Sequence, residues 1–183
     1  KNKLKGKHVG AYVSFDTTDS GLVEVKVSSS FISHEQAWIN LYRELPKSKK
    51  FHDILAEGRK SWNNELSKIK VKAENSDYGL SNKIKFYSCF YRTILFPRQF
   101  HEYNIDGQQI HYSPYNGEIL EGPLYTDNGF WDTFRAVFPF YTILYPEKLG
   151  EIMQGIMVNP YKESGWLPEW SSPGHRDLSL IHI

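Results

Sequence analysis

The segment from Tyr125 to Arg135 holds the side chains of this sequence that are best suited to binding or catalysis. Trp131, Asp132 and Arg135 place an indole, a carboxylate and a guanidinium within about one helical turn. An indole can stack on the C–H face of a sugar ring, and the charged groups can hold its hydroxyls. The same spacing also suits a structural role, with Asp132 paired to Arg135 and Trp131 in the core. The spacing alone leaves both interpretations open.

A second polar and aromatic loop extends from residue 164 to residue 177. Trp166, Glu169 and Trp170 have the side-chain types that line sugar sites, and they follow directly after an expected helix. The alternative is a loop that is held in place by its own tryptophans. This loop is therefore the second candidate region for ligand binding.

Residues 97–124 look irregular, because Tyr, His, Asn, Gly and Pro are frequent there. A polar loop of this length is often functional, so Arg98, His101, Glu102 and His111 are further candidates. For His101 and His111 the simpler expectation is a loop residue that faces solvent. No His, Asp or Glu spacing in this loop matches a metal-ligand pattern, and we predict no metal site in it.

Helices must position the first candidate region. Asp127 or Asn128 can cap a helix that we expect from Gly129 to about Tyr145, with a kink at Pro139. Its apolar stripe is formed by Phe130, Phe134, Val137 and Phe138. Pro146 favours the start of the next helix. The residues of that helix expected to face inward are Leu149, Ile152, Met153, Ile156 and Met157.

The first half of the chain predicts strands and then helices. Residues 8–29 alternate as two strands around a turn, and they should belong to a larger sheet because a lone hairpin is marginal in water. A capping box at Ser33–Gln36 opens a helix that places Ala37, Trp38, Leu41 and Leu45 inward. Two more helices are expected, one from about residue 48 and one over residues 76–96. The third should pack Leu80, Ile84, Tyr87, Tyr91 and Leu95, and Cys89 should be buried there.

The composition narrows the classes of partner. The 22 Lys and Arg residues nearly balance the 21 Asp and Glu residues, so neither a nucleic acid nor an anionic membrane surface is indicated. No stretch is long and apolar enough to predict a membrane span. Aromatic residues reach 15%, which favours a stacking surface for a flat ligand, although an aromatic core would give the same count.

The six C-terminal residues, Leu178–Ile183, match the translated end of a transposon-based sequencing adapter. We interpret them as non-native and expect them to contribute nothing to the native fold. The natural sequence is then expected to be interrupted after Asp177.

Several motifs together resemble glycoside hydrolase family 92, the calcium-dependent α-mannosidases. The most specific are the blocks at residues 131–135 and 165–170; the wider matching segments lie at residues 30–41, 95–98, 111–115, 126–136 and 162–177. The resemblance implies an α+β fragment with three parts. Residues 1–31 would be the last strands of an N-terminal β-sandwich, residues 32–75 a helical linker, and residues 76–177 the first helices of an (α/α)6 catalytic barrel.

The resemblance also implies an activity. Family members release terminal mannose from glycans with inversion, which requires a carboxylic acid and a carboxylate base. Their acid, base and calcium ligands lie downstream of the segment seen here, so no catalytic residue or calcium ligand is expected in this chain, which alone should be inactive. Asp132 matches a family position that binds sugar in the cleavage subsite, with Trp131 and Arg135 in support. Trp166, Glu169 and Trp170 match the following barrel loop.

The resemblance also implies a partner and a cellular location, and it leaves alternative functions open. The expected partner is a mannose-containing glycan, and the expected location is periplasmic or secreted. A carbohydrate-binding module, or another sandwich-plus-barrel glycosidase or phosphorylase, remains an alternative, because a fold does not fix a function.

Overall fold

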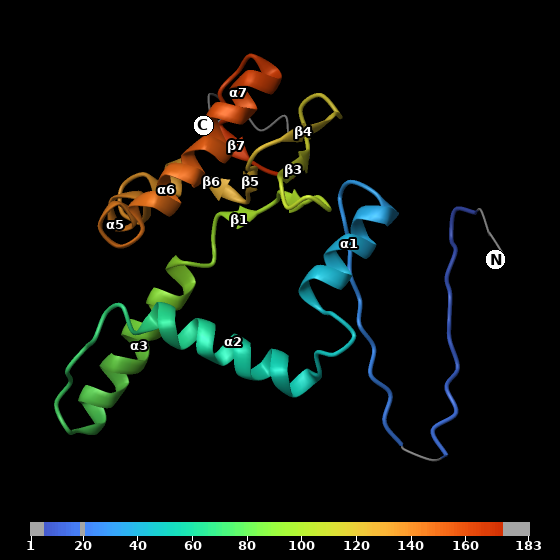
Figure 1. Ribbon diagram of the computed structural model, residues 1–183. Helices are drawn as coiled ribbons and strands as arrows, with labels where there is room; N and C mark the ends of the chain where they lie inside the picture. The colour runs from blue at the N-terminus through green and yellow to red at the C-terminus, as the bar shows by residue number, and fades with distance from the viewer. Residues whose placement is uncertain (1–5, 19–20, 174–183) are drawn as a thin grey trace.

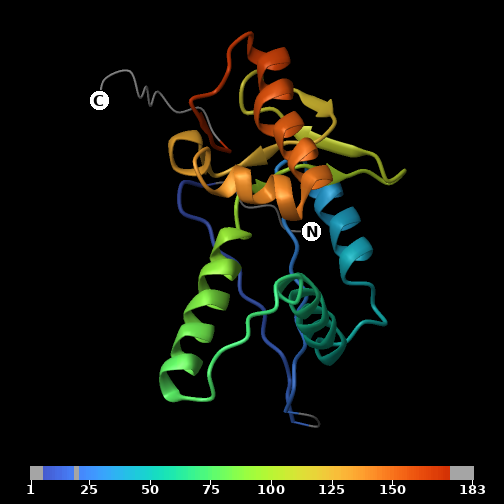
Figure 2. The ribbon, with the colours of Figure 1, turned by 90° about the vertical axis from the view of Figure 1, so that its left-hand side faces the viewer.

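The computed structural model describes residues 6–18 and 21–173, and these form a mixed helical and stranded structure (Figure 1). Helices α5, α6 and α7 gather with all the short strands in one part of the molecule. Helices α2 and α3 diverge from that part, as the perpendicular view also shows (Figure 2). The candidate regions of the sequence fall almost entirely in the first part.

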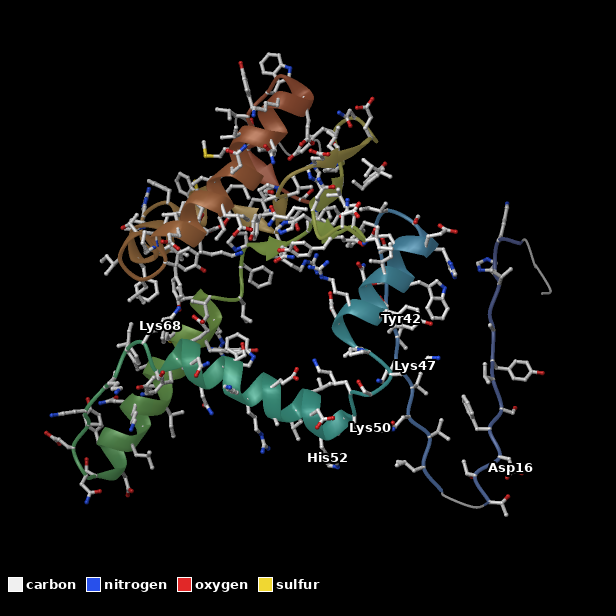
Figure 3. The ribbon with its side chains drawn as sticks, viewed as in Figure 1. Asp16, Tyr42, Lys47, Lys50, His52 and Lys68 are labelled. Atoms are coloured by element: carbon white, nitrogen blue, oxygen red, sulfur yellow. The ribbon has the colours of Figure 1, made fainter. Side chains whose placement is uncertain are left out.

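The N-terminal segment departs from the prediction. The described part of residues 8–29 contains no strand, although Figure 1 shows an extended chain that turns back on itself. One backbone hydrogen bond, from Gly21 N to Thr17 O at 2.9 Å, closes the turn. In Figure 3, Asp16 lies beside this turn, far from every helix. The predicted hairpin is wrong here because, in the described chain, no further strand pairs with these apolar faces.

Helix α1 (His34–Glu44) begins as predicted at Ser33, whose hydroxyl accepts a hydrogen bond from Gln36 N at 3.0 Å. The Gln36 side chain does not complete the capping box; it donates instead to Tyr103 O at 2.7 Å. Trp38, predicted to face inward, is exposed and stacks on Tyr42. The helix therefore uses a buried glutamine, rather than its tryptophan, to contact the rest of the molecule.

Helix α2 (Phe51–Leu66) and helix α3 (Asp77–Thr93) form at the predicted places. Ser76 caps α3 by accepting from Gly79 N at 3.0 Å. The predicted packing of α3 is largely wrong, because most of its stripe is exposed and Phe90 is its one buried large side chain among the described residues. The exposed members are Leu80, Ile84, Tyr91 and Leu95, and Cys89 is exposed as well. The Trp62 ring of α2 contacts the Tyr91 ring of α3, with their centroids 4.6 Å apart.

The segment predicted to be irregular is a small antiparallel sheet. Strands β2 (Glu102–Tyr103), β3 (Gln109–Tyr112) and β4 (Ile119–Glu121) pair in that order. Between β2 and β3 the chain turns at Gly107, which has a φ of 82° and donates its N–H to Asn104 O at 3.0 Å. The turn residues were visible in the sequence, but the strands beside them are too short and polar to show clear alternation.

Four further strands join distant parts of the chain in pairs. Strand β1 (Arg98–Gln99) pairs with β5 (Tyr125–Thr126), and β6 (Asn128–Gly129) pairs with β7 (Trp170–Ser171). Both pairs are antiparallel and only two residues long. The β1–β5 pair joins the segment after α3 to the start of the first candidate region, and the β6–β7 pair holds that region against the second candidate loop.

The helix predicted over residues 129–145 is two helices, α4 (Phe130–Thr133) and α5 (Val137–Leu144). The break precedes Pro139, which occupies the first turn of α5, where a missing N–H removes no helical hydrogen bond. The predicted cap is also wrong: Gly129 is the N-cap of α4, and no side chain caps it. Asp127 has a φ of 59° instead, and Asn128 lies in β6.

Helix α6 (Pro146–Met153) begins at its proline as predicted, and a π-helical turn (Gln154–Val158) leads into α7 (Asn159–Ser164). The core forms where this helical run covers β5: Tyr125, Tyr141, Ile152 and Ile156 are buried together. Gly155 permits the approach, because a Cβ there would lie 2.7 Å from the Tyr125 ring. The residues predicted to face inward on α6 and the π-helical turn all contribute to this core.

Candidate functional site

The β6–β7 pair brings the two candidate regions together. Asn128 pairs with Ser171 and Gly129 pairs with Trp170, so the segment that leads into α4 runs beside the end of the second loop. The Ser171 hydroxyl adds a hydrogen bond of 2.5 Å to Tyr125 O. Two regions some forty residues apart in sequence thus share one short ladder.

Gly129 lies at the closest point of this junction. A Cβ at position 129 would stand 2.5 Å from Asp132 Oδ2 and 2.7 Å from Trp170 Cη2, well inside van der Waals contact. The φ of Gly129 is −91°, which any residue can adopt, so space rather than backbone conformation requires glycine. The Asp132 carboxylate and the Trp170 indole therefore both lie next to the Gly129 Cα atom, in the space that a side chain would occupy.

Trp131, Asp132 and Arg135 all lie at the surface. Trp131 is 65% exposed, so the interpretation that places it in the core is wrong. The described structure contains no ion pair between Asp132 and Arg135; the Arg135 guanidinium instead lies 5.2 Å from the Trp131 ring centroid and 5.0 Å from that of Phe134. The guanidinium thus flanks the indole, and the carboxylate keeps its oxygens for other donors.

The second loop begins where α7 ends. Gly165 has a φ of 79° and donates its N–H to Tyr161 O at 2.8 Å, which terminates the helix. Trp166 follows at 80% exposure, with its own N–H bonded to the Ser164 hydroxyl at 3.1 Å. Glu169 is half-buried beside Trp170. No ring contact joins Trp166 to Trp131 or Trp170 within the described chain, so only Trp170 is placed directly at the Asp132 carboxylate.

Asp127 helps to hold the candidate site together, although the sequence suggested it only as a helix cap. Its carboxylate forms an ion pair with Arg98 at 2.6 Å, and so links β1 to the turn between β5 and β6. Beside it, Thr126 Oγ1 and both amide atoms of Asn128 are buried and have no hydrogen-bond partner among the described residues. Buried polar atoms without partners are rare in native proteins, and these flank the entry to α4.

The two histidines expected to face solvent are buried, and that expectation was wrong. His101 Nδ1 lies 3.2 Å from Leu124 O, and burial lowers the pKa of the ring below its ordinary value. His111 Nδ1 lies 2.9 Å from Gly122 O, and its Nε2 lies 3.0 Å from Glu163 Oε1. Both imidazoles thus contact backbone carbonyl oxygens of the segment that follows β4.

Glu102, whose role the sequence left open, has a structural one. Its Oε1 accepts from Ser30 Oγ at 3.0 Å and from Phe31 N at 2.8 Å, and its Oε2 accepts from Asn40 Nδ2 at 2.6 Å. One carboxylate thereby ties the N-terminal segment and α1 to β2.

A cleft of about 450 Å³ lies between α2, the end of α3 and the α5–α6 pair, and Tyr125 is the one residue of the first candidate segment that lines it. Trp62, Lys68, Tyr145 and Lys148 are among the side chains that line it. None of the six predicted site residues takes part. The candidate site is therefore an exposed surface around Gly129, and this cleft is a separate feature.

The described residues do not supply a metal site. Over residues 6–18 and 21–173, no three His, Cys, Asp or Glu side chains are grouped so that they could hold a metal ion. The calcium that the family resemblance implies therefore has no fitting set of ligands among the described residues.

Comparison with known proteins settles the family. The glycosyl hydrolase family 92 catalytic domain matches residues 36–180. The chain belongs to glycosyl hydrolase family 92. The match extends three residues into the C-terminal hexapeptide, which lies outside the described residues. The resemblance inferred from the two loops is thereby confirmed.

Solved family 92 structures are similar to this chain. The inverting mannosidase BT2199 from Bacteroides thetaiotaomicron VPI-5482 is 47% identical, with a TM-score of 0.74 over 82% of this chain. The family glycosyl hydrolase ccman5 is 23% identical over 70% of this chain, with a TM-score of 0.59, and supports the fold alone. The chain spans 20% and 16% of these two proteins.

A curated relative from another organism is also similar to this chain. An uncharacterized secreted glycosidase of Arthroderma benhamiae is 25% identical over 166 residues, or 87% of this family 92 chain and 16% of the relative. None of the described helices is long and apolar enough to cross a membrane.

Proposed function

We propose that this chain forms part of an α-mannosidase that removes terminal mannose from glycans with inversion at the anomeric carbon. The observation that carries the proposal is the 47% identity with a family 92 inverting mannosidase over 82% of the chain. The proposal includes a secreted or periplasmic location, which is supported by the description of the Arthroderma benhamiae relative as secreted. It also includes a division into the end of a β-sandwich domain (1–31), a linker (32–75) and the first barrel helices (76–177); the described part of residues 8–29 is extended and forms no strand in this chain.

In this proposal the surface around Gly129 binds the sugar. The exposed Asp132 carboxylate accepts hydrogen bonds from sugar hydroxyls, because no cation of the described chain pairs with it. The Trp170 indole beside it offers a stacking face for the ring. The Arg135 guanidinium contacts the Trp131 ring and supports it. Trp166 and Glu169 would contact the substrate from the second candidate loop.

Hydrolysis needs more than this surface. Inversion requires an acid for the leaving group and a base for water, on opposite faces of the sugar. We assign neither role to a residue of this chain, and we assign calcium no ligand here. The proposal therefore places the bond-breaking groups in the rest of a longer enzyme, and it predicts that residues 1–183 alone release no mannose.

The test uses the full-length enzyme that contains this chain. Incubation with an aryl α-mannoside, followed by proton NMR, should show β-mannose as the first-formed anomer. An α-anomer formed first would exclude inversion, and the absence of mannoside cleavage would reject the α-mannosidase assignment.

A carbohydrate-binding surface without catalysis is the second candidate. The strong exposure of Trp131 and Trp166 favours it, since large exposed aromatic side chains suit glycan stacking. Isothermal titration with mannose-containing glycans separates the two. Binding with no hydrolysis by the full-length protein supports the second candidate, and turnover supports the first.

A further inference from the structure

His111 and Glu163 form a buried contact between the small sheet and the helical layer. The His111 side chain is fully buried, the Glu163 side chain is 6% exposed, and Nε2 lies 3.0 Å from Oε1. The second carboxylate oxygen of Glu163 is buried and has no hydrogen-bond partner in the described chain. A carboxyl group in such a place depends on the histidine, because burial without a partner is costly.

The hydrogen positions follow from the acceptors. Gly122 O can only accept, so the Nδ1 atom 2.9 Å away carries a hydrogen. The other contact, between Nε2 and a carboxyl oxygen, then requires one shared hydrogen, whichever of the two groups holds it. The contact is therefore a hydrogen bond that a neutral amide could also make, with its N–H donated to Nε2.

The position of Glu163 links this contact to the candidate loop. Glu163 lies in the last turn of α7, just before Gly165, where the helix ends and the loop begins. His111 lies in the middle strand of the three-stranded sheet, held by β2 and β4 on either side. The other end of the loop, at Trp170, is held by the β6–β7 pair.

We propose that His111 and Glu163 are positioning residues, which fix the N-terminal end of the Gly165–Trp170 loop and so set Trp166 relative to the sugar site. The inference about loop order rests on the contacts alone; its effect on sugar binding rests on the proposed function. Tyr115 also faces this pair: burial and the charge of Glu163 raise its pKa to about 12, which keeps its hydroxyl protonated.

The test compares three variants of the full-length enzyme. Glu163→Met removes the hydrogen bond while filling similar volume, and Glu163→Gln retains it through the amide. Glu151→Met is the control for loss of a carboxylate near the other buried histidine: Glu151 belongs to α6, its Oε1 lies 3.8 Å from His101 Nε2, and it accepts a hydrogen bond from the Tyr125 hydroxyl at 2.8 Å. Amide hydrogen exchange over residues 164–170 is measured first, and kcat and KM on an aryl α-mannoside second.

Glu163→Met should speed exchange in the loop by roughly 10-fold to 100-fold, whereas Glu163→Gln and Glu151→Met should leave it near the parent rate. Unchanged exchange in Glu163→Met, or equal acceleration in Glu151→Met, would overturn the positioning role whatever the enzyme cleaves. If Glu163→Met does not fold, the test rests on Glu163→Gln. Faster amide exchange over residues 164–170 in that variant than in the parent would also overturn the positioning role. Faster exchange with unchanged kcat and KM keeps the positioning role and removes the loop from the sugar site.

Discussion

Gly129 and Trp170 are partners in the β6–β7 ladder, and the Trp170 ring occupies the space that a Cβ at position 129 would need. The Asp132 carboxylate approaches the same space from α4. The relative placement of the indole and the carboxylate thus depends on the absence of one methyl group.

Gly129→Ala tests this dependence. The added methyl would push Trp170 and Asp132 apart, and overpacking of this kind costs about 1–3 kcal/mol. In the full-length enzyme we expect a lower Tm and a lower kcat/KM for aryl α-mannosides. Gly150→Ala is the control, because apart from its chain neighbours and the backbone of its own helix nothing lies within 4 Å of a Cβ there. It should stabilise helix α6 by about 0.5–1 kcal/mol. Equal effects of the two substitutions would contradict the close approach at Gly129.

Asp132→Ala tests sugar binding directly. A carboxylate that accepts hydrogen bonds from sugar hydroxyls contributes about 1.5–3 kcal/mol, so kcat/KM should fall roughly 10-fold to 200-fold. The Tm should stay unchanged, because Asp132 is exposed and forms no ion pair with Arg135. Asp106→Ala, in the exposed turn between β2 and β3, is the matched control and should alter neither quantity. An early-melting Asp132→Ala enzyme with normal turnover would make Asp132 a structural residue.

His101 predicts a pH dependence of stability. Burial lowers its folded-state pKa below the ordinary value of 6.5, so the unfolded chain binds this proton more readily. The contribution of His101 to stability is complete above pH 6.5 and is lost as the pH falls toward the folded-state pKa. The Tm of the full-length enzyme should decline below pH 6.5, and the Tm of the His101→Gln variant should decline less steeply. If the Tm falls equally steeply with pH in the parent enzyme and in His101→Gln, the His101 ring is not buried in its uncharged form.

The helices could largely be predicted from the sequence, because their start signals are local. Ser33, Ser76 and Pro146 each open a helix at the predicted place. Helix interiors were predicted less well, since which face is buried depends on partners that the helix itself does not contain. The exposed stripe of α3 is the clearest case, because it has helical spacing but few described neighbours.

The candidate site could be predicted in its residue types but not in its geometry. Trp131, Asp132 and Arg135 were selected by local spacing, and spacing suggested an Asp–Arg pair that the structure does not contain. The approach of Trp170 to Asp132 depends on a two-residue ladder between β6 and β7, too short to leave an alternating pattern. His101 and His111 were misplaced for a similar reason, because burial by a later helical segment leaves no mark on the loop sequence.

Glu102→Ala tests the connection between the N-terminal segment and the sheet. The carboxylate accepts three hydrogen bonds, from Ser30 Oγ, Phe31 N and Asn40 Nδ2, and its loss leaves these donors without their acceptor. Because the site is only partly buried, water can replace some of these bonds, and we expect a loss of about 1–3 kcal/mol. Calorimetry of the full-length enzyme should show a lower Tm, and limited proteolysis should cut residues 21–33 faster. Glu118→Ala, at an exposed position between β3 and β4, is the matched control and should leave both unchanged. If Glu102→Ala melts and is cleaved like the control, these three hydrogen bonds do not anchor the segment in solution.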